Sequence, residues 1–119
     1  MMVHQMNPEM RQCIDACTEC SSICRETVNY CLERGGRLAE PKQLRMLMDC
    51  AEMCRTNADF MLRASEAHTE TCSVCAELCR RCAEECERMA GGDAMLLRCA
   101  VACRRCAEAC VKVDKLAAV

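Results

Sequence analysis

The sequence CSVCAELCRRCAEEC, residues 72–86, has a cysteine at every third or fourth position. Steps of three and four return to the same face of an α-helix, so these five cysteines form one stripe. The residues between them are mostly Ala, Glu and Arg, which favour helix and suit an exposed surface. The stretch therefore predicts a helix with a buried stripe of thiols and a solvated outer face.

The same spacing recurs in three other segments. Apart from one step of seven, the cysteines within each segment are three or four residues apart. The stripes consist of Cys13, Cys17, Cys20, Cys24 and Cys31, then Cys50 and Cys54, then Cys72, Cys75, Cys79, Cys82 and Cys86, and finally Cys99, Cys103, Cys106 and Cys110. We expect their remaining positions to be filled by Thr27, Leu47, Asn57, Met61, Ala64, Met89, Leu96 and Val113.

Capping residues and glycines indicate where the helices begin and end. Asn7 before Pro8 is a helix start, the Gly35–Gly36 pair a stop, and Asp93 a second N-cap. We expect helices at 8–34, 41–63, 66–90 and 94–115, with Ser65 capping the third. No segment alternates with the period of a strand. These observations predict an all-α protein, an up-and-down four-helix bundle with a cysteine-lined core, forming a single domain over residues 1–119.

Composition narrows the functional classes. The 119 residues include 16 cysteines but no Trp, one Phe and one Tyr, so thiols replace aromatic bulk in the core. A net charge of −2 gives no basic field for nucleic acid or anionic lipid. The N-terminal stretch lacks signal-peptide features, and no apolar run approaches the roughly 20 residues of a membrane span. We therefore expect a cytoplasmic protein, in a compartment where cysteines serve metals or redox chemistry.

Thiols at helical spacing suit a soft metal ion. Side chains four residues apart have Cβ atoms about 5–6 Å apart, which allows a two-coordinate metal between their sulfurs. Thiolates select Cu(I), zinc or iron–sulfur clusters. One Cu(I) per thiolate leaves the core neutral, whereas four Zn²⁺ on sixteen thiolates would leave about eight buried negative charges. The sequence therefore favours Cu(I).

Several residues carry an alternative interpretation. Buried cysteines that only pack, or disulfides between facing helices, are the structural alternatives for the stripes. Methionine thioethers bind Cu(I) weakly and suit an entrance, but a single Met more often fills a core. The candidate donors are Met46, Met89 and Met95 near one end of the bundle and Met61 and His68 near the other. Asn57 is either a buried amide bonded to backbone, which we favour, or an oxygen ligand.

With the segments CIDACTECSSIC, CAEMC, CSVCAELCRRCAEEC and CAVACRRCAEAC, the chain resembles the bacterial copper storage proteins of the cytosolic type. The resemblance implies a four-helix bundle that binds many Cu(I) ions and assembles as a homotetramer. It also implies copper uptake at the end that carries Met46, Met89 and Met95. By the same resemblance, the copper ligands are Cys13, Cys17, Cys20, Cys24, Cys31, Cys50, Cys54, Cys72, Cys75, Cys79, Cys82, Cys86, Cys99, Cys103, Cys106 and Cys110.

The sequence thus predicts a cytoplasmic, non-enzymatic store of Cu(I) with several ions per chain. A copper chaperone or a low-molecular-weight thiol is the candidate partner, and neither nucleic acid nor membrane is expected to bind. A general heavy-metal detoxification or thiol redox role, like that of a metallothionein, is the alternative. An iron–sulfur electron carrier is a third.

Overall fold

The structure, a computed structural model, describes residues 6–117, with side chains placed as far as Lys115. It contains four α-helices and one 3₁₀ helix, and this part of the chain contains no strand. The helices are α1 (Pro8–Arg34), α2 (Pro41–Leu62), α3 (His68–Ala90) and α4 (Ala94–Ala117), with η1 (Gly36–Ala39) between α1 and α2. The predicted all-α class is confirmed.

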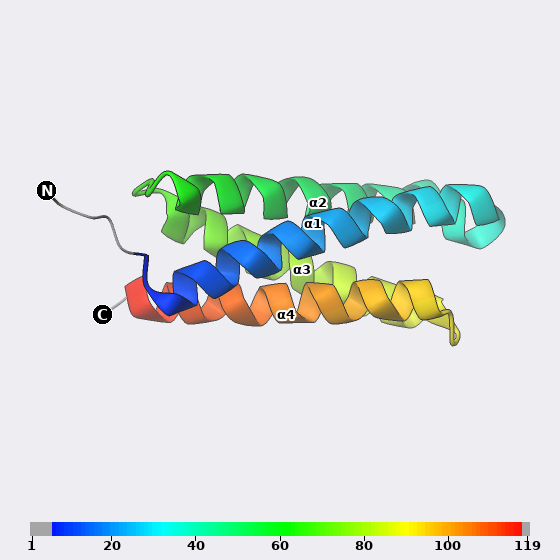
Figure 1. Ribbon diagram of the computed structural model, residues 1–119. Helices are drawn as coiled ribbons and strands as arrows, with labels where there is room; N and C mark the ends of the chain where they lie inside the picture. The colour runs from blue at the N-terminus through cyan, green and yellow to red at the C-terminus, as the bar shows by residue number, and fades with distance from the viewer. Residues whose placement is uncertain (1–5, 118–119) are drawn as a thin grey trace, which may run out of the picture.

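The four helices run alternately up and down the long axis of a body measuring 56 × 22 × 20 Å (Figure 1). Each helix packs against the next in sequence, and α4 also packs against α1, which closes the bundle. The α1–α2 and α3–α4 connections lie together at one end, here called the turn end. The opposite end, called the terminal end, holds the α2–α3 connection, the start of α1 and the end of α4 (Figure 1).

Side-chain caps fix the starts of two helices where the sequence placed them. The Asn7 side-chain oxygen accepts a hydrogen bond from the Met10 amide at 2.8 Å, at the start of α1. Asp93 Oδ1 accepts from the Met95 and Leu96 amides at 2.9 and 3.1 Å, at the start of α4. Gly35 ends α1 with a φ of 69°, a left-handed conformation that costs glycine little. The predicted bounds of α1 are confirmed in full.

The connection between α2 and α3 differs from the prediction. Helix α3 begins at His68 rather than residue 66, and Ser65 does not cap it through its side chain. Ala64 has a φ of 55° and is exposed, so its expected place in the core stripe is wrong. The backbone turns because the Ala64 and Ser65 amides donate back to carbonyls of the last turn of α2. A turn between the two helices was expected here, but helical spacing projected past Leu62 placed Ala64 on the core stripe, and the turn takes it off that stripe.

The core is made mainly of thiols. All sixteen cysteines are at most 1% exposed, and Leu47, Met61, Leu96 and Val113 fill positions toward the two ends. The outer face carries ion pairs such as Arg80–Glu77 at 2.7 Å within α3 and Arg104–Glu87 at 2.7 Å between α4 and α3. Across residues 6–117, no helix is long and apolar enough to cross a membrane.

Candidate metal centre

Five groups of four buried cysteines hold their sulfurs within 4.8 Å of one another. Each group takes its members from three different helices, so helix packing and not sequence spacing alone assembles it. From the terminal end to the turn end, the quartets are Cys17, Cys75, Cys106 and Cys110; Cys54, Cys75, Cys79 and Cys106; Cys20, Cys50, Cys54 and Cys79; Cys20, Cys24, Cys50 and Cys103; and Cys24, Cys82, Cys99 and Cys103.

Neighbouring quartets overlap, and each shares two cysteines with the next. The five quartets therefore use twelve of the sixteen cysteines and form one continuous column along the bundle axis. In such a column a thiolate lies within reach of metal ions in two adjacent quartets. The arrangement suits bridging thiolates, and metal bound in one quartet has neighbours in the next.

The closest sulfur pairs lie between helices. Cys106 and Cys17 are 3.4 Å apart, and Cys54 and Cys79 are 3.5 Å apart. Within one helix, the CxxxC pair Cys20–Cys24 is 3.9 Å apart. Sulfurs joined through a two-coordinate metal lie about 4.6 Å apart, taking the zinc–thiolate length of about 2.3 Å as a guide. Small side-chain rotations are therefore enough to admit Cu(I), both along a helix and between helices.

Four predicted ligands lie outside the five quartets. Cys13 contacts Cys110 at 3.5 Å, which extends the column toward the terminal end. Cys72 lies 3.8 Å from the sulfur of Met61. Cys86 and Cys31 continue the stripes of α3 and α1 toward the turn end, and both are buried. None of the sixteen cysteines forms a disulfide.

Burial and neighbouring groups oppose ionisation of Cys31 and Cys86, which lie toward the turn end. Burial raises the pKa of the Cys31 thiol, and Asp93 and Cys99 raise it further. The pKa of Cys86 is raised by hydrogen bonding with Cys82 and Cys99 and by burial. A metal that binds these groups must displace their protons, so uptake here is coupled to proton release.

Asn57 is the polar member of the column, at its terminal end. Its amide nitrogen donates to the sulfurs of Cys17 and Cys110 at 3.4 and 3.5 Å. Its amide oxygen accepts from the Thr71 hydroxyl at 2.7 Å. The expectation that this amide bonds backbone is therefore wrong, because two sulfurs and a hydroxyl occupy the positions that backbone groups would have taken.

The methionines and His68 divide between the two ends as predicted, and they differ from one another in how deeply they are buried. Met61 is fully buried beside Cys72, whereas His68 is half-buried and its Nδ1 lies 2.9 Å from the Ser65 carbonyl oxygen. At the turn end, Met46 and Met95 are half-buried. Met89 is 6% exposed, and its sulfur accepts from the Arg37 guanidinium at 3.5 Å.

Besides Ser21, sequence reasoning missed a second buried polar residue, Gln43. It lies on the stripe of α2, one turn beyond Leu47 toward the turn end, and is 2% exposed. Neither polar atom of its amide has a hydrogen-bond partner among the residues described. The signal was available, because Gln43, Leu47, Cys50 and Cys54 follow one another at steps of four, three and four.

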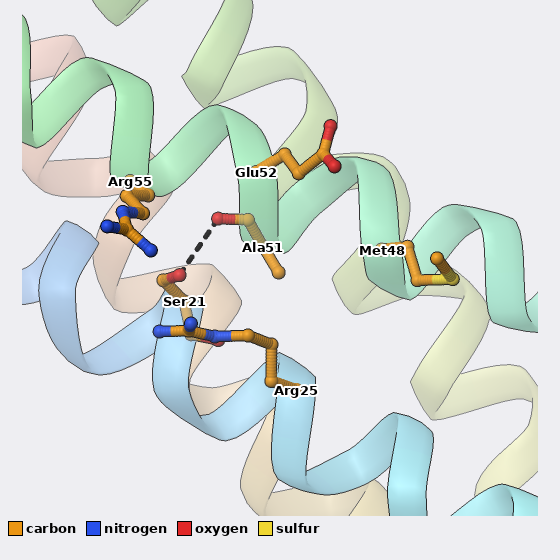
Figure 2. A pocket seen from close by; sticks show the side chains of 6 residues that line it. All are labelled: Ser21, Arg25, Met48, Ala51, Glu52 and Arg55. Carbon is orange, nitrogen blue, oxygen red and sulfur yellow. Dashed lines mark hydrogen bonds between the residues drawn. The ribbon is translucent and has the colours of Figure 1, made fainter.

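The sides of the bundle do not open onto the thiols. A hollow of about 270 Å³ lies between α1 and α2, where Ser21 donates a hydrogen bond to the Ala51 carbonyl oxygen and Arg25 and Arg55 are among the lining residues (Figure 2). A second, of about 660 Å³, lies between α3 and α4. No cysteine lines either hollow. The column is therefore covered along its length by the helices themselves.

The fold and the site together define a class of protein: an all-α bundle whose core is a continuous column of thiols for soft metal ions. The chain also matches the sequence model of the copper storage proteins over residues 6–115. It therefore belongs to the copper storage protein family.

Solved structures of similar proteins share the fold. The Nmul_A1745 protein of Nitrosospira multiformis is 42% identical, with a TM-score of 0.85 over 93% of this chain and 99% of that one. The Cu(I)-bound copper storage protein BsCsp3 is 29% identical, with a TM-score of 0.83 over 89% and 98%. A cytosolic copper storage protein from Streptomyces lividans, with five coppers, is 31% identical, with a TM-score of 0.79 over 90% and 92%.

A curated relative from Bacillus subtilis, the uncharacterized cysteine-rich protein YhjQ, is 32% identical over 66 residues. The match covers 56% of this chain and 61% of that protein's own length.

Proposed function

We propose that this chain stores Cu(I) on thiolates that line its core, with all sixteen cysteines as ligands in a single domain spanning residues 1–119. The observation that carries the proposal is the column of five overlapping cysteine quartets. Overlap matters because bridging thiolates let many ions occupy adjoining sites, which is what high capacity requires. The Cu(I)-bound relative of the same fold supports the choice of metal.

Charge favours Cu(I) over divalent ions in this column. One Cu(I) per thiolate leaves no net charge, whereas Zn²⁺ held by four thiolates leaves two negative charges per site in a core whose described residues include no buried cation. Because adjacent quartets overlap, at most three of the five can be filled without sharing a cysteine. Separate tetrahedral sites for Zn²⁺ in the column would therefore number three. The two metals therefore predict different stoichiometries.

Capacity is the decisive measurement. Titration of the reduced protein with Cu(I) under anaerobic conditions, against a competing chelator, is expected to show tight uptake of about 16 ions per chain, within a few, at one ion per bridging thiolate. Tight uptake that stops near three or four ions would reject the storage proposal. It would favour general heavy-metal binding at separate sites instead.

Colour separates the remaining alternative. A Cu(I)-thiolate protein does not absorb visible light, because Cu(I) has a filled d shell, whereas an iron–sulfur protein is brown. When the isolated protein is incubated with iron and sulfide, we expect it to form no stable chromophore that absorbs visible light. A stable brown cluster would support the electron-carrier alternative.

We further propose that the protein acts in the cytoplasm, without catalysis, as a homotetramer. Its similarity to the cytosolic storage protein of Streptomyces lividans supports the location. A copper chaperone or a low-molecular-weight thiol is the proposed exchange partner. Ligand exchange between thiolates gives such a partner a chemically direct way to deliver or withdraw Cu(I).

We propose that copper passes through the turn end. Met46 and Met95 are half-buried there, and Met89 follows Cys86 on the buried stripe of α3. At the terminal end, Met61 is fully buried against Cys72. Half-buried thioethers are reachable from solvent and hold Cu(I) weakly, so they suit capture and transfer.

A further inference from the structure

The side-chain amide of Asn57 closes the terminal end of the thiol column, and both its nitrogen and its oxygen have hydrogen-bond partners. Asn57 is fully buried, and its amide nitrogen lies within 3.5 Å of the sulfurs of Cys17 and Cys110. An amide has two N–H donors and one oxygen acceptor. Two sulfurs take the donors, so the nitrogen faces the quartet.

Thr71 holds the amide in that orientation. Its hydroxyl lies 2.7 Å from Asn57 Oδ1 and 3.1 Å from the His68 carbonyl oxygen, and its single proton favours the nearer acceptor. If the amide were turned over, the Thr71 hydroxyl would face N–H groups and the two sulfurs would face an oxygen. The oxygen is therefore directed at Thr71, away from the metal-binding sulfurs.

We propose that Asn57 is a positioning residue of the store: oriented by Thr71, its N–H groups hydrogen-bond to the sulfurs of Cys17 and Cys110 and strengthen Cu(I) binding at the terminal quartet. This inference rests on the proposed storage function. It assigns Asn57 a role beside the ligands rather than among them.

The physical reason lies in the charge of the sulfurs. When Cu(I) binds, it replaces the thiol proton, which leaves to solvent, and no electron is transferred. A copper-bound thiolate keeps more negative charge than a thiol, so it accepts a stronger hydrogen bond. While a quartet holds fewer Cu(I) ions than ionised thiolates, the excess charge is buried and costly unless donors face it. Hydrogen bonds to metal-bound sulfur tune the site in this way.

The chain supplies a matched comparison at the other end of α2. Gln43 is a second buried carboxamide on the same stripe, but its amide has no partner among the described side chains or backbone. Thr27 is a second buried threonine, and its hydroxyl donates to the Ile23 carbonyl oxygen of its own helix at 2.7 Å. Gln43→Leu and Thr27→Val therefore remove the same chemical groups without touching the terminal quartet.

The test compares Cu(I) affinities of Asn57→Leu, Asn57→Asp and Thr71→Val with those of the parent and the two controls. Affinities come from anaerobic competition with a chromophoric Cu(I) chelator, and far-UV circular dichroism checks the fold. We expect Asn57→Leu and Asn57→Asp to weaken about four of the bound equivalents by roughly ten- to a hundredfold, as loss of partners around metal ligands does elsewhere. Thr71→Val should weaken the same equivalents less, and the controls should match the parent.

The aspartate variant separates two roles for residue 57. A carboxylate has no N–H donors but is a better oxygen ligand than an amide. If Asn57→Asp binds Cu(I) as tightly as the parent or more tightly, residue 57 coordinates copper through oxygen and the inference is wrong. The inference is also wrong if Asn57→Leu binds Cu(I) as tightly as the parent.

Nuclear magnetic resonance of the parent gives an independent readout, because Cu(I) is diamagnetic. The Asn57 side-chain amide signals should move downfield as copper loads, since their acceptors become charged. Signals that stay in place would overturn the inference, even if a variant at residue 57 failed to fold. If the parent itself takes up only three or four ions, the storage function fails first. If it takes up about 16 and the variants match it, only the role of Asn57 fails.

Discussion

At the scale of single residues, the polar side chains inside the thiol core divide into those that have hydrogen-bond partners and those that have none. Ser21 and Thr27 donate to backbone carbonyl oxygens at 2.9 and 2.7 Å, and Asn57 bonds sulfurs and a hydroxyl. Gln43 is the exception in the described core. A buried amide without partners loses its hydrogen bonds to water on folding and recovers none.

Replacing Gln43 by Leu should therefore stabilise the metal-free protein. We expect the free energy of unfolding to rise by about 1–3 kcal/mol, the cost of an unpaired buried polar group. Chemical denaturation of the reduced protein measures the change. Gln12→Leu, on the exposed surface of α1, is the control and should change the free energy of unfolding by less than about 0.5 kcal/mol. A less stable Gln43→Leu variant would indicate that Gln43 has a stabilising partner.

At the scale of helices, Asp93 joins the α3–α4 connection to α1. Its carboxylate caps α4 through the Met95 and Leu96 amides and also accepts a hydrogen bond from the Tyr30 hydroxyl. The Tyr30 hydrogen bond is the main cause that holds the pKa of Asp93 below its usual value of 3.8. One side chain thus fixes both the start of α4 and its position against α1.

We expect Asp93→Ala to lower the free energy of unfolding by on the order of 1 kcal/mol at pH 7, the usual cost of losing an N-cap. Because the pKa of Asp93 is lower in the folded protein than in the unfolded chain, its charged form contributes in full above about pH 4. That contribution is lost as the pH falls through the folded pKa. The gap in the free energy of unfolding between parent and variant should therefore be smaller at pH 2 than at pH 5, as measured by chemical denaturation. A gap that widens in acid would contradict this assignment.

The ends of the bundle set the proposed route for copper. Replacing Met46, Met89 and Met95 together by Leu keeps side-chain volume nearly constant, so the fold and the capacity should change little. Loading from a chelated Cu(I) donor, followed by stopped flow, should slow because the weak thioether donors are gone. The matched control is Met61→Leu with His68→Ala at the terminal end. If the control slows and the triple variant does not, copper passes through the terminal end.

At the scale of the whole molecule, the bundle should form before any metal binds. The helices carry strong formers, caps and apolar stripes, and free thiols pack as small hydrophobic groups. Far-UV circular dichroism of the reduced, metal-free protein is expected to be mainly helical already, unlike that of a zinc finger, which folds around its ion. A coil spectrum that becomes helical only with Cu(I) would contradict preorganisation and favour a metallothionein-like protein.

Much of this architecture was predictable from the chain alone. The steps of three and four between cysteines predicted four helices with buried thiol stripes, and Asn7, Gly35 and Asp93 predicted helix ends that the structure confirms. These features depend on interactions within a few residues along the chain. Local spacing and capping are therefore enough to specify them.

Only the tertiary structure decided which thiols meet. Every quartet combines three helices, and the partners of Asn57 lie on α1, α3 and α4. Such distances depend on how antiparallel helices are rotated about their axes and staggered along them, which the packing of all four helices determines together. The absence of a hydrogen-bond partner for the Gln43 amide among the described residues escaped prediction for the same reason. Periodicity places a residue on a face of its helix, and the neighbouring helices decide what that face contacts.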